Sequence, residues 1–141
     1  MTREEIVALL DHVNDSINRH DVEAMGGDYT GDCIVESPMA GAPVHGREAV
    51  QTLHRGLFTS FPDLQVRRES LLVDGDAVAS LSKLSGTDTG GFMGIPPTNK
   101  KFECSLVRLY ELRDGLIARE RRIYDFTGLL VQIGVLKAKP A

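Results

Sequence analysis

Apolar residues in the first sixty positions recur at helical spacing. The stripe that predicts a first helix, ending near residues 19–20, consists of Ile6, Leu9, Leu10, Val13 and Ile17. Asp21 begins a second, short helix that Gly26 and Gly27 end. A third helix opens at residues 46–50 and stops before Pro62, with an apolar face made of Val50, Leu53, Leu57 and Phe61. A short strand at residues 34–37 separates the second and third helices.

The pattern changes to that of long strands after residue 63. Segments 64–73 and 77–85, and then 101–112 and 116–124, are each joined by a turn signal that predicts a hairpin. A loop rich in glycine and proline is expected at residues 86–99, a short helix at 126–133 and a frayed tail at 137–141. Three helices ahead of a meander of strands indicate α+β, as a single domain over residues 1–141. A curved sheet covered by helices on its concave side leaves a cone with an opening, where small ligands bind.

Composition and charge narrow the function classes. The 141 residues carry a formal net charge of −4, so the basic face of a nucleic-acid-binding protein is not expected. No apolar run is long enough to span a membrane, and the N-terminus lacks the apolar stretch of a signal peptide. Cys33 and Cys104 are expected to be free, buried thiols in a reducing cytoplasm. No pair of histidines has metal-ligand spacing, so no metal site is predicted.

Four segments resemble a known family. Residues 86–100, 114–117 and 124–134, with a weaker match at 61–64, resemble the SnoaL-like polyketide cyclase (ester cyclase) family of the nuclear transport factor 2-like superfamily. The resemblance implies a cone-shaped, cystatin-like α+β barrel with three N-terminal helices, a deep apolar pocket and no cofactor. It also implies a homodimer formed through the outer face of the sheet. The superfamily holds cyclases, isomerases, epoxide hydrolases, dehydratases and proteins without chemistry, so the resemblance specifies the fold better than the reaction.

Two positions in the segment 86–100 differ from what relatives often carry. Asp88 stands where relatives often have histidine, and Asn99 where they often have glycine. Because Asn tolerates a positive φ, the turn at Asn99 is expected to survive. The differences bear on the substrate more than on the fold.

Asp125 is the main candidate for catalysis. In SnoaL-like cyclases an Asp near the end of the last strand is the general acid/base of an intramolecular aldol closure, and the resemblance places Asp125 there. If the side chain points into the cone, burial raises its pKa and allows it to take and return a proton. Asp125 also directly precedes the helix predicted at 126–133, where an Asp ordinarily caps the helix. The two roles do not exclude one another.

Arg121 is a second candidate. Ile117 and Ile123 are expected to face the core, and Arg121 shares their strand parity. An inward Arg121 can bind a substrate carboxylate or enolate. The alternative is a solvated ladder in which the charged residues 119–122 pair with glutamates on the strand 101–112.

Ser37 precedes Pro38 at the end of the first strand. In the related ketosteroid isomerases the base is an Asp at the corresponding position, so the isomerase machinery is not intact here. Ser37 is expected to face the pocket as a hydrogen-bond donor, and the alternative is a strand-end serine with no role.

Further residues are expected to line the pocket. His54 lies on the third helix, where a lone histidine is either structural or part of the pocket. Phe92 and Met93 lie in the glycine-rich loop, so residues 90–97 are a candidate lid or dimer contact. The predicted pocket residues are Met39, His54, Phe58, Phe61, Phe92, Met93 and Tyr124.

Three functions follow from these features. The first is an enzyme that cyclises, isomerises or hydrates a small hydrophobic carbonyl or epoxide substrate by acid/base chemistry at Asp125. The second is a protein of the same fold that binds a small hydrophobic ligand without converting it. The third, weaker interpretation is a protein–protein interaction module that uses the open sheet.

Overall fold

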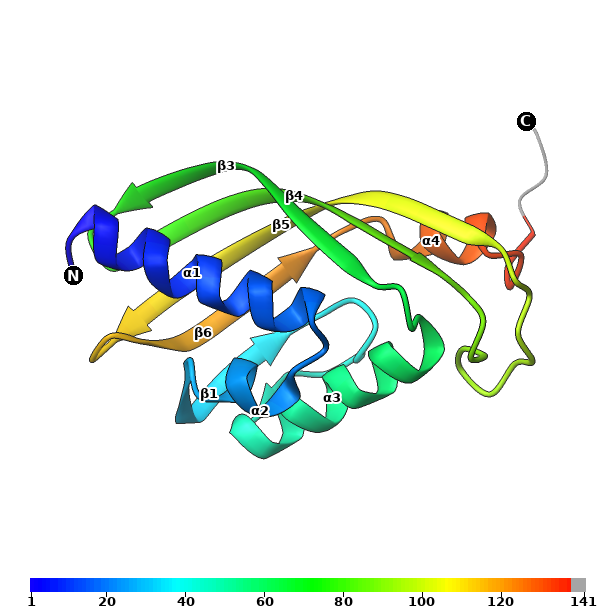
Figure 1. The fold of residues 1–141 in the computed structure, drawn as a ribbon, viewed down its shortest axis with the longest axis horizontal. Coiled ribbons are helices and arrows are strands. Elements are labelled where there is room, and N and C mark those ends of the chain that lie inside the picture. The colour runs from blue at the N-terminus through cyan, green and yellow to red at the C-terminus, as the bar shows by residue number, and fades with distance from the viewer. Residues whose placement is uncertain (138–141) are drawn as a thin grey trace.

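The computed structural model describes residues 1–137, in which helices and a long bent sheet form two layers (Figure 1). The helices are α1 (Arg3–Asn18), α2 (Val22–Gly26), α3 (Arg47–Ser60) and α4 (Phe126–Gln132). The strands are β1 (Tyr29–Glu36), β2 (Val44–His45), β3 (Gln65–Asp74), β4 (Ala77–Thr87), β5 (Lys101–Arg113) and β6 (Leu116–Ile123). The predicted α+β class is confirmed.

One sheet contains all the strands of the described residues, in the order β2-β1-β6-β5-β4-β3. β1 runs parallel to β6, and every other neighbouring pair is antiparallel. Helices α1, α2 and α3 lie against one face of this sheet, inside its curve, whereas α4 follows β6 at one end (Figure 1). This arrangement leaves the interior between α3 and the sheet.

Local sequence signals explain the helix ends. The side chain of Thr2 accepts a hydrogen bond from the backbone N–H of Glu5 at 3.1 Å and so caps α1. The side chain of Asp21 accepts from the N–H of Ala24 at 3.0 Å and caps α2. Between these helices, His20 has a φ of 58°, which ends α1 where the sequence predicted.

Two strands differ from the sequence prediction. β1 begins five residues earlier than the predicted strand at 34–37, because Tyr29 and Thr30 are buried and Tyr29 pairs with Ile117 of β6. β2 was not predicted, since two residues are too few for a periodic pattern. Of the predicted tail at 137–141, only Lys137 lies within the described residues.

A bulge in β6 changes which residues face inward. Leu112 of β5 is opposite Ile117, but Glu111 is opposite Arg119, so Ala118 is an extra residue in β6. An extra residue moves every later side chain to the other face of the sheet. Beyond the bulge, the interior therefore receives Glu120 instead of Arg119.

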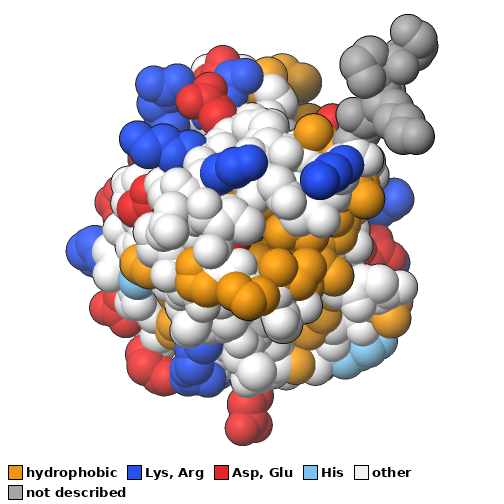
Figure 2. Space-filling model, turned by 90° about the vertical axis from the view of Figure 1, so that its right-hand side faces the viewer, with side chains coloured by type: hydrophobic (Ala, Val, Ile, Leu, Met, Phe, Trp, Pro, Cys, Tyr) orange, Lys and Arg blue, Asp and Glu red, His pale blue; other side chains and the backbone are white. Residues whose placement is uncertain are grey.

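Apolar residues pack in two clusters on the inner side of the sheet. The larger joins α1, α2 and the sheet around Ile6, Val13, Met25 and Tyr29. The smaller lies at the end of the molecule near α4 and consists of Phe61, Leu64, Phe92, Phe102, Leu129 and Ile133. That end carries hydrophobic side chains on its surface as well (Figure 2). None of the helices within residues 1–137 is long and apolar enough to cross a bilayer.

Candidate functional site

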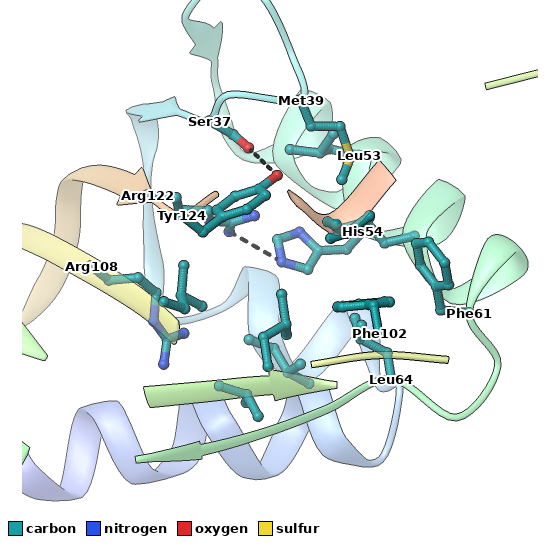
Figure 3. A pocket seen from close by; sticks show the side chains of 16 residues that line it. Ser37, Met39, Leu53, His54, Phe61, Leu64, Phe102, Arg108, Arg122 and Tyr124 are labelled. Carbon is teal, nitrogen blue, oxygen red and sulfur yellow. Dashed lines mark hydrogen bonds between the residues drawn. The ribbon is translucent and has the colours of Figure 1, made fainter. Parts of the chain in front are cut away.

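An apolar cavity of about 50 Å³ lies between α3 and the inner face of the sheet. Figure 3 shows the sixteen side chains that line it. They are Ile17, Ser37, Met39, Leu53, His54, Leu57, Phe61, Leu64, Val66, Leu84, Phe102, Leu106, Arg108, Arg122, Tyr124 and Leu129. The lining is mostly hydrophobic with a few polar groups, as is typical of a small-molecule site.

The polar groups gather on one side of the cavity. In Figure 3, Ser37, Tyr124, Arg122 and Arg108 lie on the side away from Phe61. The hydroxyl oxygens of Ser37 and Tyr124 are 3.3 Å apart and share a hydrogen bond. Burial raises the pKa of Tyr124 although the Ser37 contact opposes it, so the phenol keeps its proton and can donate it in a hydrogen bond.

His54 is a neutral hydrogen-bond acceptor in this site. Its Nδ1 lies 2.9 Å from the carbonyl oxygen of Val50, and its Nε2 lies 3.1 Å from Nη2 of Arg122. A carbonyl only accepts and a guanidinium only donates, so the proton is assigned to Nδ1 and the Nε2 lone pair accepts from Arg122. Burial, together with the charge of Arg122, lowers the pKa of His54 to about 3.

Glu120 forms the second contact of Arg122. The carboxylate is fully buried; it accepts from Nε of Arg122 and from the hydroxyl of Tyr29 at 2.6 Å. Burial by itself raises the pKa of Glu120, but the charges of Arg122 and Arg108 outweigh it, so the net pKa is lowered. Glu120 is therefore ionised, and with His54 it fixes the position of the Arg122 guanidinium.

Arg108 is the second cation of the cavity. It is 2% exposed, and its Nη2 donates to the side-chain oxygen of Asn14 at 2.7 Å. Its guanidinium carbon lies 5.7 Å from the ring centre of Tyr110, within range of a cation–π interaction. Both partners are uncharged.

Asp125 does not occupy the predicted interior position. Its side chain is exposed, and its Oδ1 accepts from the N–H of Gly128 at 2.8 Å, which makes it the N-cap of α4. Among residues 1–137, it is not one of those that line the cavity. The inward orientation predicted for Asp125 is thus wrong and the capping alternative is confirmed, while its part in catalysis stays a prediction.

Arg121 is on the outer face, contrary to the orientation predicted from strand parity. Its Nε lies 2.8 Å from Oε2 of Glu36, and Arg119 pairs with the other oxygen of Glu36 at 3.1 Å. The bulge at Ala118 reverses the parity that Ile117 suggests, so Arg122 takes the inward place. The alternative of a solvated ladder was also only partly right, because the partner is Glu36 of β1.

The predicted pocket residues divide into two groups. Those that line the cavity are Ser37, Met39, His54, Phe61 and Tyr124.

The others lie outside the lining. Phe58 stacks on His20 with ring centres 4.1 Å apart, and Phe92 packs behind Phe61 at 5.1 Å. Met93 is 61% exposed at the tip of its loop. For these residues the pocket prediction is wrong, because Phe58 turns toward His20 and the loop turns Phe92 into the core and Met93 into solvent.

Asp88 anchors this loop. Its buried carboxylate accepts from the N–H of Gly91 at 3.0 Å and from the N–H and hydroxyl of Thr98 at 3.2 and 3.1 Å. Asn99 has a φ of 61°, as expected for a position where glycine is common. Asp88 therefore has a structural part in holding the two ends of the loop together.

Three functional candidates were missed at the sequence level. Arg122 and Glu120 could not be placed inside without knowledge of the bulge. Arg108 had a usable signal, because it shares strand parity with Phe102, Leu106 and Tyr110 in β5, all of which are buried.

The described residues contain no cluster of typical metal ligands. Within residues 1–137, no three side chains of His, Cys, Asp or Glu converge in a way that could hold one. Cys33 is buried and Cys104 half-buried, and both are free.

Comparisons with known proteins agree with this architecture. Residues 7–133 match the sequence profile described as SnoaL-like polyketide cyclase. TsrD from Streptomyces laurentii has a similar structure, with a TM-score of 0.86 and 25% identity, covering 96% of this chain and 99% of TsrD. AclR from Streptomyces galilaeus, proposed to be a hydroxylase, has a TM-score of 0.84 and 27% sequence identity, covering 99% of this chain and 91% of AclR. IdmH from Streptomyces antibioticus, proposed to be a polyketide cyclase, has a TM-score of 0.79 and 26% sequence identity, covering 91% of this chain and 97% of IdmH.

No curated protein matches the sequence significantly. The solved neighbours include proteins described as having the ketosteroid isomerase-like or nuclear transport factor 2-like fold, as the sequence predicted.

Proposed function

Because the chain belongs to the SnoaL-like polyketide cyclase family, we propose that it is a cyclase or isomerase acting on a small hydrophobic carbonyl compound. The observation that carries the proposal is the concentration of hydrogen-bond donors on one wall of an otherwise apolar cavity. In an intramolecular aldol closure, a carbon next to one carbonyl gives a proton to a water molecule and attacks a second carbonyl of the same molecule. The resulting alkoxide then takes up a proton, so no co-reactant is consumed.

The donors suit the negative oxygen that forms in such a reaction. The Tyr124 and Ser37 hydroxyls share one hydrogen bond, and Tyr124 holds its proton at neutral pH. Arg122 is fixed by Glu120 and His54 beside them. Donors that are already oriented in a site shielded from water stabilise an enolate or alkoxide without having to reorganise.

Deuterium exchange tests this proposal without knowledge of the natural substrate. Heptane-2,6-dione in D₂O serves as the probe, since exchange at its α-carbons reports enolate formation. We expect the protein to accelerate exchange above buffer, and Tyr124→Phe to slow the protein-dependent rate at least about tenfold. Tyr110→Phe is the matched control, because Tyr110 is a buried tyrosine that does not line this cavity. Exchange at the buffer rate, or equal loss in both variants, contradicts the proposal.

A second function is binding without turnover. Its supporting observation is that no carboxylate of residues 1–137 lines the cavity and that Nε2 of His54, which does line it, already accepts from Arg122, so none of these groups is a free proton acceptor. Mass spectrometry of molecules that co-purify with the protein separates the two functions. An apolar metabolite recovered unchanged after prolonged incubation supports binding, and its conversion supports catalysis.

The outer face of the sheet favours the expected homodimer. Leu72 is 72% exposed and Ile123 is 48% exposed, and Leu81 and Leu109 lie between them across the sheet. Burial of these side chains against a second copy removes apolar surface from water. Sedimentation at micromolar concentration is expected to show a dimer, and a single species near the chain mass of 15.4 kDa contradicts it.

A further inference from the structure

The interior around the cavity holds more positive than negative charge. Arg108 and Arg122 both line the cavity and are buried, whereas Glu120 is the only carboxylate of residues 1–137 that forms an ion pair with either of them. That pair joins Glu120 to Arg122. The charge of Arg108 acts on Glu120 from a distance, but no carboxylate of residues 1–137 is in direct contact with Arg108. The three groups together carry one net positive charge.

Arg108 is also incompletely hydrogen-bonded. Its Nε is buried and has no acceptor within the described part of the chain. Its other contacts, the Asn14 amide oxygen and the Tyr110 ring, are neutral. Buried cations are normally paired and buried N–H groups normally have acceptors, so Arg108 is an exception that calls for an anion.

The remaining polar groups of the cavity do not supply this negative charge. His54 is neutral and accepts from Arg122, and the hydroxyls of Ser37 and Tyr124 bond to each other. Arg108 and Arg122 approach the cavity from the side opposite Phe61 (Figure 3). A ligand with an anionic head and a hydrophobic body thus matches the distribution of charged and apolar residues around the cavity.

We propose that the cavity takes small hydrophobic compounds that carry a carboxylate, and that Arg108 is the residue that selects for this group. A guanidinium binds a carboxylate through charge-assisted hydrogen bonds, which are stronger than those to a neutral amide. The inference rests on the proposed function in that it names the substrate class of the same cavity. It makes Arg108 a specificity-determining residue, separate from the Tyr124 and Arg122 wall assigned to the reacting carbonyl.

Binding of two probes of equal length tests the inference. Hexanoate and hexanamide share the same apolar body and differ in the charge of the head group. We expect titration calorimetry or NMR at neutral pH to give about tenfold tighter binding of hexanoate, the difference expected between charge-assisted and neutral hydrogen bonds. Equal affinity, or no binding of either probe at millimolar concentration, overturns the inference.

Substitutions locate the preference. Arg108→Gln removes the charge and keeps a donor toward Asn14, so it is expected to reduce the hexanoate preference to within about threefold. Arg108→Lys keeps the charge and should retain most of the preference for hexanoate. Arg121→Gln is the matched control, because Arg121 is an exposed arginine near the end of β6 outside the cavity lining. A preference that survives Arg108→Gln, or that Arg121→Gln reduces equally, contradicts the assignment.

The two proposals fail separately. If Arg108→Gln does not fold, the wild-type comparison of hexanoate with hexanamide still decides the inference. Carboxylate preference without deuterium exchange removes the cyclase proposal and leaves the carboxylate subsite. Exchange into the neutral dione without any carboxylate preference removes the subsite and leaves the cyclase proposal.

Discussion

Arg122 donates a hydrogen bond to Nε2 of His54 at 3.1 Å, although the two residues come from β6 and α3 and are 68 positions apart. The contact joins the helix layer to the sheet layer at the wall of the cavity. It helps to set the tautomer of the imidazole and, together with burial, keeps the ring uncharged. It also orients the cation that the proposed function assigns to an enolate or alkoxide oxygen.

The neutral state of His54 predicts a specific dependence of stability on pH. Its pKa is about 3 in the folded protein, against an ordinary value of 6.5. Between these values the unfolded chain binds a proton that the folded chain does not, so the free energy of unfolding falls as pH decreases below 6.5. The expected slope from this residue is about 1.4 kcal/mol per pH unit.

Urea denaturation of the wild type and of His54→Gln at pH 5 and pH 7 measures this slope. The variant lacks the titrating group. On going from pH 7 to pH 5, the wild type should therefore lose more of its free energy of unfolding than His54→Gln does. His45→Gln is the control, because His45 is exposed on β2. A constant difference between wild type and His54→Gln would mean that the imidazole is accessible to protons in the folded state.

Because Glu120 and Arg122 form a buried ion pair, we expect the effects of substituting them on the free energy of unfolding to be strongly coupled. Arg122→Met leaves the Glu120 charge buried without its ion-pair partner and is expected to cost about 3–5 kcal/mol of the free energy of unfolding. Adding Glu120→Gln removes the charge and keeps an acceptor for the Tyr29 hydroxyl, so the double variant should be more stable than Arg122→Met alone.

Chemical denaturation of the four proteins of this cycle measures the coupling. Arg121→Met serves as the comparison on the same strand, where loss of an exposed ion pair should cost at most about 1 kcal/mol. Equal losses at positions 121 and 122 would contradict the buried position of Arg122.

The capping geometry of Asp125 separates stability from catalysis. Asp125→Asn keeps an oxygen that can accept from the N–H of Gly128, so stability should change little, whereas Asp125→Ala should cost about 1 kcal/mol. Because the Asp125 side chain is exposed and outside the cavity lining, we expect both variants to keep deuterium exchange into heptane-2,6-dione near the wild-type rate. A loss of about a hundredfold in Asp125→Asn, with stability intact, would instead establish Asp125 as the acid/base predicted from the sequence.

Gly90, in the loop that Asp88 anchors, has no room for a larger side chain. A Cβ added to Gly90 would lie 1.7 Å from the carbonyl oxygen of Thr59, which belongs to the backbone and cannot move aside cheaply. We expect Gly90→Ala to destabilise the protein by at least about 2 kcal/mol, a cost typical of overpacking.

Gly56 provides the control for this substitution. It lies within α3, and a Cβ there meets nothing within 4 Å, so Gly56→Ala should be neutral or stabilising by up to about 1 kcal/mol. Thermal unfolding of both variants checks the pair of expectations. A Gly90→Ala protein as stable as the wild type would show that the loop does not pack against the end of α3.

Local patterns were enough to predict most of the fold. The apolar stripe from Ile6 to Ile17, the start of the second helix at Asp21, and the turns between strands all arise from interactions within a few residues. Such interactions can be read from neighbouring positions. The cap at Asp125 belongs to the same class, and the capping alternative for this residue was accordingly correct.

The candidate site depended on tertiary structure. A single extra residue at Ala118 decides whether Arg121 or Arg122 faces the cavity, and a bulge leaves no reliable mark in the pattern of side chains. The partners of Arg122 are equally non-local, since His54 and Tyr29 come from other elements. The sequence alone determined the α+β class, because this class follows from local propensity and periodicity. The family, and with it the expectation of an interior pocket, came from the resemblance of the segments 61–64, 86–100, 114–117 and 124–134 to known relatives. Which charges enter that pocket was decided only when the strands paired, because strand register is a property of the assembled sheet.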